Sequence, residues 1–228
     1  IVGYGAGHSQ TTSLENTLLG YYAGGEVTDG AYNTFVGSSA GQSATTPSDN
    51  TAVGSRAMAA TTTGSDNTAL GKSAMAANTT GSRNLAIGVQ AYDASDTEND
   101  NIAIGFDAMT TDTAGGQYNI AIGNYAADAL TSGDNNIVMG HNAASNLTSG
   151  GNNTVVGFDA LLATTTQSNN TAFGFQALRA NTAADNTAFG KDALVLNTTG
   201  DYNVAVGRSA LAANTTGASN LAIGTNTL

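Results

Sequence analysis

The chain has 228 residues and a net charge of −11, with six Lys and Arg residues in total and no Cys. A nucleic-acid or anionic-membrane surface needs a basic patch, so this charge argues against both classes of partner. Without Cys there is no disulfide framework or thiolate site, and no apolar run reaches the roughly 18 residues that predict a membrane-spanning segment.

One short pattern recurs from end to end: an Asn four residues before a Gly, as in the segment 67–71, Asn-Thr-Ala-Leu-Gly. It occurs thirteen times, and the spacing between successive Asn residues is 17, apart from 18 between Asn101 and Asn119 and 16 between Asn170 and Asn186. Repeats of this length are typical of solenoids. We therefore expect residues 1–228 to form one continuous solenoid domain of about 13 coils. Because the chain begins in the middle of a repeat, we expect it to be a fragment of something longer.

The residues between the Asn and the Gly predict a short β-strand in every copy. Large or branched apolar residues flank a small one, as in Ile102, Ala103 and Ile104, and this alternation fits a strand. We expect the large residues to face inward and to stack from coil to coil, with the Ala row facing the other way. No uninterrupted stretch keeps the 3.6-residue period of a helix. The predicted fold class is therefore all-β, a parallel β-solenoid.

The Gly that ends each strand predicts a corner, either with positive φ or with a backbone approached too closely for a side chain. An Ala follows three residues later, and then Leu or Met in most copies from residue 58 onward, such as Met75. We expect this pair to form a second, shorter strand whose large residue fills the interior. That strand should be weaker where the large residue is replaced by Gly7, Gly24 or Gly41.

The segments Asn-Thr-Thr-Gly at 78–81, 197–200 and 214–217 have the composition of turns. They predict an outer loop in each coil. Both departures from the 17-residue period, near 113–116 and 182–184, fall in this loop, as expected of a surface connection that tolerates changes in length.

An Asn at the same place in every coil predicts a stacked ladder of amides, in which each side chain can donate to and accept from its neighbours. We interpret this ladder as structural. Its central members are Asn67, Asn84, Asn101, Asn119, Asn136 and Asn153.

The segments 49–54, 119–123 and 203–207 each end in Ala, then Ile or Val, then Gly. They resemble the Asn-Ser-Val-Ala-Ile-Gly repeats of YadA-type trimeric autotransporter adhesin heads, and equally the related repeats of phage and bacterial trimeric fibres. The resemblance implies a left-handed parallel β-roll that forms a homotrimer with the Ala face turned toward the partners. It also implies an extracellular location, either on an outer-membrane-anchored fibre at the cell surface or on a virion tail fibre. The 17-residue coil is longer than the repeat usual in those heads.

No catalytic constellation emerges from the sequence. His8 and His141 occupy different repeat positions, and the acidic residues are scattered singly or in the run 96–100. The nonapeptide of calcium-binding β-rolls is absent. We therefore expect no enzyme activity, no catalytic residue, no cofactor and no dedicated metal site, with adventitious binding of Ca²⁺ left open.

The residue after each corner glycine carries the candidate surface contacts. It is aromatic at Tyr4, Tyr21, Phe106, Phe158 and Phe175. Exposed aromatic rings could stack on sugars of a host glycan or receptor, whereas the alternative is packing against a subunit or over neighbouring coils. Lys72, Lys191 and Arg208 occupy the same position, so it tolerates solvent.

The leading functional hypothesis is a structural and adhesive fibre segment, exposed on a cell or virion, that mediates attachment to a host or surface. The alternative is an ice-binding β-solenoid, because such proteins present regular Thr arrays. A Thr follows the ladder Asn at 17, 34, 51 and 68, but Leu85 and Ile102 replace it in the next two copies, as expected of an inward or interfacial row. A polysaccharide-degrading tailspike would need paired carboxylates in a cleft, for which the chain offers no clear place.

Overall fold

A computed structural model of the chain describes residues 1–12, 15–111 and 115–228. Throughout these residues the fold is a parallel β-solenoid without helices, built from coils of about 17 residues that each contribute one three-residue strand, so the predicted fold class is confirmed. The chain divides into unit 1, residues 1–115, and unit 2, residues 116–228. Each unit is described by itself, and the continuity of a single domain stays a prediction.

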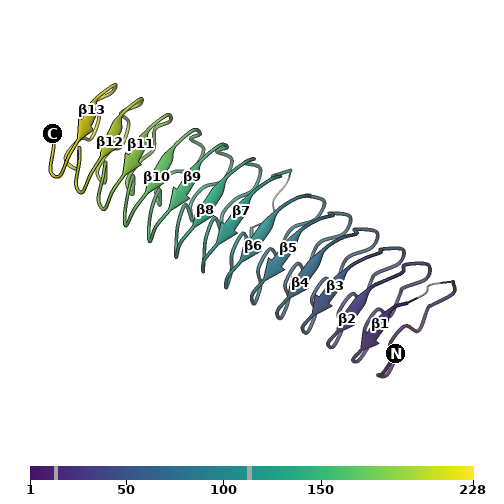
Figure 1. Ribbon diagram of the computed structural model, residues 1–228. Coiled ribbons are helices and arrows are strands. Elements are labelled where there is room, and N and C mark those ends of the chain that lie inside the picture. Colours follow the sequence, from purple (N-terminus) through teal and green to yellow (C-terminus); the bar gives the residue numbers. More distant parts are fainter. Residues whose placement is uncertain (13–14, 112–114) are drawn as a thin grey trace. The chain divides into compact units, whose positions relative to one another are not determined.

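Within each unit every strand pairs in parallel with the next strand along the chain, and the pairing joins equivalent repeat positions, for example Thr51 with Thr68 (Figure 1). Unit 1 contains β1 (Thr17–Leu19), β2 (Thr34–Val36), β3 (Thr51–Val53), β4 (Thr68–Leu70), β5 (Leu85–Ile87) and β6 (Ile102–Ile104). Unit 2 contains β7 (Ile120–Ile122), β8 (Ile137–Met139), β9 (Thr154–Val156), β10 (Thr171–Phe173), β11 (Thr187–Phe189), β12 (Val204–Val206) and β13 (Leu221–Ile223).

The central residue of each strand faces the interior, which reverses the predicted orientation. Ala69, Ala103 and Ala121 are fully buried, whereas Leu70 beside Ala69 is 48% exposed. The reason is space: one strand and its return turn enclose a thin interior that cannot accept two large side chains from every strand. The small residue therefore points inward, and the two larger ones point away from the core.

The core volume of each coil is shared among three inward positions: the strand centre, and the fourth and seventh residues after the corner glycine. Where the fourth is Gly, as at Gly24 and Gly41, the strand centre is Leu18 or Phe35. Where the strand centre is Ala, the fourth residue is usually large and buried, as at Met75. Further examples are Met58, Tyr92, Met109, Leu178 and Leu194 at the fourth position, and Leu130 and Leu147 at the seventh beside Ala127 and Ala144. In these coils a large residue at one inward position is thus accompanied by a small one at another, as expected of a closely packed interior.

The predicted second strand is wrong, because this stretch is a turn. Met58 and Met75 have φ of 53° and 56°, and Gly7 and Gly41 at the same position both have φ of 56°. The first coils are therefore not weaker here; they adopt the same left-handed turn with the residue best suited to it. The prediction that the large residue fills the interior was nevertheless right, since Met58 and Met75 are fully buried.

The corner glycines are required by both conformation and contact. Gly71 has φ of +141°, and a Cβ atom there would lie 2.3 Å from the carbonyl oxygen of Gly88 in the next coil. Only glycine populates this region without strain. The same close approach recurs from coil to coil within each unit, so it sets how tightly successive corners stack.

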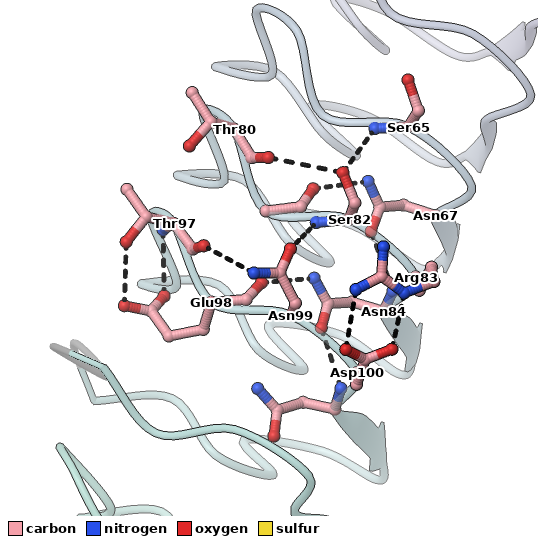
Figure 2. Close-up of polar contacts among 12 residues, drawn as sticks. Ser65, Asn67, Thr80, Ser82, Arg83, Asn84, Thr97, Glu98, Asn99 and Asp100 are labelled. Carbon is pink, nitrogen blue, oxygen red and sulfur yellow. Dashed lines mark hydrogen bonds and ion pairs between the residues drawn. The ribbon is translucent and has the colours of Figure 1, made fainter.

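The Asn ladder joins each coil to the next through the main chain (Figure 2). The Oδ1 of Asn67 accepts a 2.9 Å hydrogen bond from the main-chain N–H of Asn84, and its Nδ2 donates to the carbonyl oxygen of Gly81 at 2.8 Å. Equivalent bonds in unit 2 run from the main-chain N–H of Asn136 to Asn119 and from that of Asn153 to Asn136. Direct amide-to-amide bonds, such as the 3.1 Å bond from Asn136 to Asn119, occur only in some coils. Each buried amide is therefore satisfied mainly by backbone groups.

The outer loops carry a second ladder, in which Thr hydroxyls such as those of Thr45 and Thr62 donate to a carbonyl of the following coil at 3.0 and 3.1 Å. The one-residue deletion falls in this loop, around Thr182. The predicted insertion lies partly outside the described residues, at 113–114. Among the described residues there is no helix with the length and hydrophobicity needed to traverse a bilayer.

Candidate functional site

The first candidate surface is the strand face, which we define as the two outward residues that flank the buried centre of each strand. In unit 2 the row of third strand residues is apolar, and Met139, Phe173 and Phe189 in it are 39%, 43% and 50% exposed. The row of first strand residues in unit 2 includes Thr154, Thr171 and Thr187. The rings of Phe173 and Phe189 stack, with centroids 4.7 Å apart. In unit 1 the strand face pairs an apolar row, such as Leu19 and Leu70, with a row that begins Thr17, Thr34, Thr51 and Thr68.

This geometry corrects the interpretation of the Thr row. Thr51 and Thr68 are exposed, so the row does not face inward as the sequence suggested. It also moves the predicted subunit contact. The Ala row is part of the core of each unit, and the residues available to a partner are the larger ones on either side of it.

The second candidate surface is the turn row, the residues that directly follow the corner glycines. Tyr4 and Tyr21 stack with centroids 5.7 Å apart, and Tyr22 packs edge-on against both. In unit 2, His141, Phe158 and Phe175 form a continuous stack with centroid distances of 5.5 and 5.4 Å. Lys191 continues it, with Nζ 5.4 Å from the centre of the Phe175 ring. Phe106, the fifth aromatic predicted here, is also exposed.

The stacking limits what this row can bind. Phe158 and Phe175 are nearly parallel, at 8°, so each covers one face of the other. Sugar rings pack against aromatic faces rather than edges, and only a stack's end residues keep a face open. The stacked arrangement therefore favours the alternative that these rings pack over neighbouring coils. Each such aromatic pair contributes about 0.5–1.5 kcal/mol to stability beyond the effect of its buried area.

Several charged groups on the surface have partners within the described chain. Arg83 holds Asp100 through two bonds of 2.7 and 2.8 Å (Figure 2), and this contact lowers the pKa of Asp100. Hydrogen bonds from Thr12 and Thr11 lower the pKa of Asp29. Tyr4, together with burial, raises the pKa of Tyr22. These are inter-coil contacts at the surface, where ion pairs contribute little to stability.

One pair of carboxyl groups differs from the rest. Burial raises the pKa of Asp93 despite a hydrogen bond from Gln90, and the nearby Asp107 raises it further. Burial also raises the pKa of Asp107, whose Oδ1 has no hydrogen-bond partner in the described chain. Two carboxyl groups without a third ligand do not make a metal site, and no group of three or more His, Cys, Asp or Glu residues occurs in the described parts of the chain.

The two histidines that the sequence offered lie in different units. His141 lies in the aromatic stack rather than beside a nucleophile, with Tyr125 edge-on at 5.8 Å. His8 is exposed in a coil of unit 1. The sequence reasoning did not predict that the strand face is exposed. The sequence did contain a signal for it, because the strand centre is large where the fourth residue after the glycine is Gly, which indicates that both positions face the interior.

The chain matches no protein-family model, no curated protein and no solved structure. A functional assignment must therefore come from the surfaces themselves.

Proposed function

We propose that the chain is a structural and adhesive segment of an extracellular fibre, in which copies associate through the strand face and outward side chains bind the host or surface. The observation that carries this proposal is the exposed apolar strand face, as at Met139, Phe173 and Phe189. Monomeric proteins rarely leave a contiguous apolar patch of more than a few hundred Å² in water. A second copy of the same regular face is a natural cover for it.

Three copies is the number that the resemblance to trimeric fibres implies, and so is the location on an outer-membrane-anchored fibre or a virion tail fibre. Solenoid coils suit such a role because each contacts only its neighbours, so length is added without changing the fold. The proposal includes no chemical reaction and no cofactor.

The test is the mass of the chain in solution, compared with 22.6 kDa for one copy. We expect a homotrimer that the double substitution Met139→Glu with Phe173→Glu converts to monomers, because each charge would be buried at the interface. Far-UV circular dichroism should keep its β signal. Arg208→Glu, a charge reversal in the turn row, serves as the control and should leave the mass unchanged. A stable monomer formed by the unaltered chain would refute the proposal.

An ice-binding β-solenoid remains the second candidate, and one observation favours it. Thr17, Thr34, Thr51 and Thr68 face outward from four consecutive, in-register strands, where parallel pairing spaces them about 4.8 Å apart. Ice binding predicts thermal hysteresis that the double substitution Thr34→Lys with Thr51→Lys abolishes. Absence of hysteresis in the unaltered chain would rule this function out.

A further inference from the structure

A hollow of about 470 Å³, open to solvent, lies on three neighbouring coils of unit 1. The polar groups that line it are those of Ser39, Gln42, Ser43 and Arg56, and Ala59 and Ala76 form part of its apolar wall.

The hollow has a cause in the sequence. Ala59 and Ala76 are the fifth residues after their corner glycines, in consecutive coils. The same position in unit 2 holds Leu162, Arg179 and Val195 in three consecutive coils. Two short side chains in succession therefore leave space that longer side chains occupy elsewhere on the same backbone.

The polar groups around the hollow are free to bind a ligand. Among the described residues, no carboxylate lies within ion-pair distance of Arg56, whose side chain is exposed. The hydroxyls of Ser39 and Ser43 likewise have no hydrogen-bond partner within the described chain. An arginine fork and two hydroxyls without partners in the described chain thus line one open hollow together with short Ala side chains.

The equivalent place in unit 2 shows what is missing. There Asp159 is the second residue after one corner glycine, and Arg179 is the fifth residue after the next. The Oδ2 of Asp159 lies 4.0 Å from the Nε of Arg179. In unit 1 these two positions hold Arg56 and Ala76, so the cation is present and the carboxylate is not. A guanidinium binds a carboxylate through two parallel hydrogen bonds, which is the interaction left unfilled.

We propose that this hollow binds an acidic saccharide, with the sugar carboxylate on Arg56, sugar hydroxyls on Ser39, Gln42 and Ser43, and the C–H face of the ring against Ala59 and Ala76. A hydroxyl-rich ring with one carboxylate matches a site that has several neutral hydrogen-bonding groups and one cation. A polyanion does not match it, because the chain carries a net charge of −11 and would repel a densely charged polymer.

This inference deepens the adhesive part of the proposed function and rests on it for its biological role. The two fail separately. Self-association is measured by mass and depends on the strand face, whereas the hollow is lined by residues of a single chain and can be tested in any oligomeric state.

The probe is the methyl glycoside of galacturonic acid, which carries one carboxylate, titrated into the full chain by calorimetry at low salt, with its methyl ester as the matched neutral saccharide. We expect the acid to bind at least about 10-fold more tightly than the ester, because the ester lacks the charged carboxylate that accepts two parallel hydrogen bonds from the guanidinium. Ala76→Asp should weaken binding of the acid to a similar extent by giving Arg56 an internal partner. Asp93 and Asp128 occupy the same repeat position, so the coil accepts this residue.

Ala212→Asp, the same change at the same position in a distant coil, is the control and should bind the acid like the unaltered chain. Arg56→Gln should lose the preference for the acid over the ester. The proposal is overturned if the ester binds as tightly as the acid, if Ala76→Asp has no effect, or if no binding is detected at about 10 mM saccharide. Acetate that competes as well as the acidic methyl glycoside at equal molarity would also overturn it, since the site would then bind any carboxylate.

Discussion

Two pairs of coils have interiors of the same kind but differ on the outside. One pair ends its strands at Gly54 and Gly71 in unit 1, and the other at Gly157 and Gly174 in unit 2. Each has a buried Asn, a small strand centre, a buried Met or Leu in the turn and a corner glycine with φ near +140°. Their turn rows differ, with Ser55 and Lys72 in the first pair and Phe158 and Phe175 in the second.

The difference shows how this chain separates architecture from chemistry. Inward positions must match the coils above and below, so the same residues recur there. Outward positions meet solvent or a ligand, and they change from one coil to the next without moving the backbone. The open hollow at Arg56 and the ion pair of Asp159 with Arg179 involve the same repeat positions and differ only in the side chains there.

The largest effect should come from the corner glycines, and it should be equal in the two regions. Gly71→Ala and Gly157→Ala would each place a Cβ atom within 2.3 Å of the next carbonyl oxygen. The strained φ and the clash together should cost at least about 3 kcal/mol. Urea unfolding would measure the loss, with Ser55→Ala as a neutral control. A loss below about 1 kcal/mol in either region would show that the corners do not set the coil stacking.

The exchange of core volume predicts a rescue. Met75→Gly alone should destabilise by about 2–5 kcal/mol because it leaves a cavity, and Ala69→Leu alone should overpack the coil by about 1–3 kcal/mol. Together they reproduce the arrangement of Leu18 with Gly24, so the double variant should be more stable than Met75→Gly.

The same exchange in unit 2, Ala172→Leu with Leu178→Gly, is the matched test, and thermal unfolding reports both. Additive losses in the two regions would contradict the shared-volume rule. Rescue in only one region would show that the interiors are less alike than their sequences indicate.

The coils and strands could be predicted from the sequence because in-register parallel pairing preserves a repeat period directly. The orientation of the strands could not be read from alternation alone. A large-small-large pattern such as Thr68, Ala69 and Leu70 allows either set to face inward, and the width of the coil decides. The one available signal was that Leu18 and Phe35 replace Ala in the coils where Gly24 and Gly41 replace Met.

For the turn row, the sequence left two arrangements open, exposed rings that bind a ligand and rings that pack over neighbouring coils or against a subunit. Repeat spacing places Phe158 and Phe175 in neighbouring coils, yet whether rings stack depends on side-chain rotamers that a period does not encode. The hollow at Arg56 was not predicted, because its walls come from side chains of three coils and its opening depends on residues that are small. Single-residue patterns do not reveal such a space.

The aromatic stack should contribute a moderate amount of stability that the first pair of coils lacks. Phe158→Ala removes the ring between His141 and Phe175 and should cost about 1–2 kcal/mol. Ser55→Ala, at the same repeat position in unit 1, should change stability by less than about 0.5 kcal/mol. Equal effects in chemical denaturation would mean that the stack adds nothing, which would return these rings to the list of candidate ligand contacts.

The smallest effect concerns two acidic residues at the second position after the corner glycine, Asp107 in unit 1 and Asp192 in unit 2. Because burial raises the pKa of Asp107, the folded state binds its proton more tightly than the unfolded state does. Its contribution is stabilising at pH values below the ordinary Asp pKa of about 3.9 and is lost as the pH rises through the raised value. Asp107→Asn should therefore be more stable than the unaltered chain at pH 7, and this advantage should shrink at pH 3.

Asp192→Asn should act in the opposite direction at pH 7. It removes a carboxylate that lies 3.7 Å from Lys191 Nζ, a surface pair worth at most about 1 kcal/mol. Thermal unfolding of both variants at pH 3 and pH 7 measures the contrast. If both substitutions change stability with the same sign at pH 7, the two units do not differ in how they surround this carboxylate. The neighbouring side chains would then not decide whether a carboxylate at this repeat position stabilises or destabilises the fold.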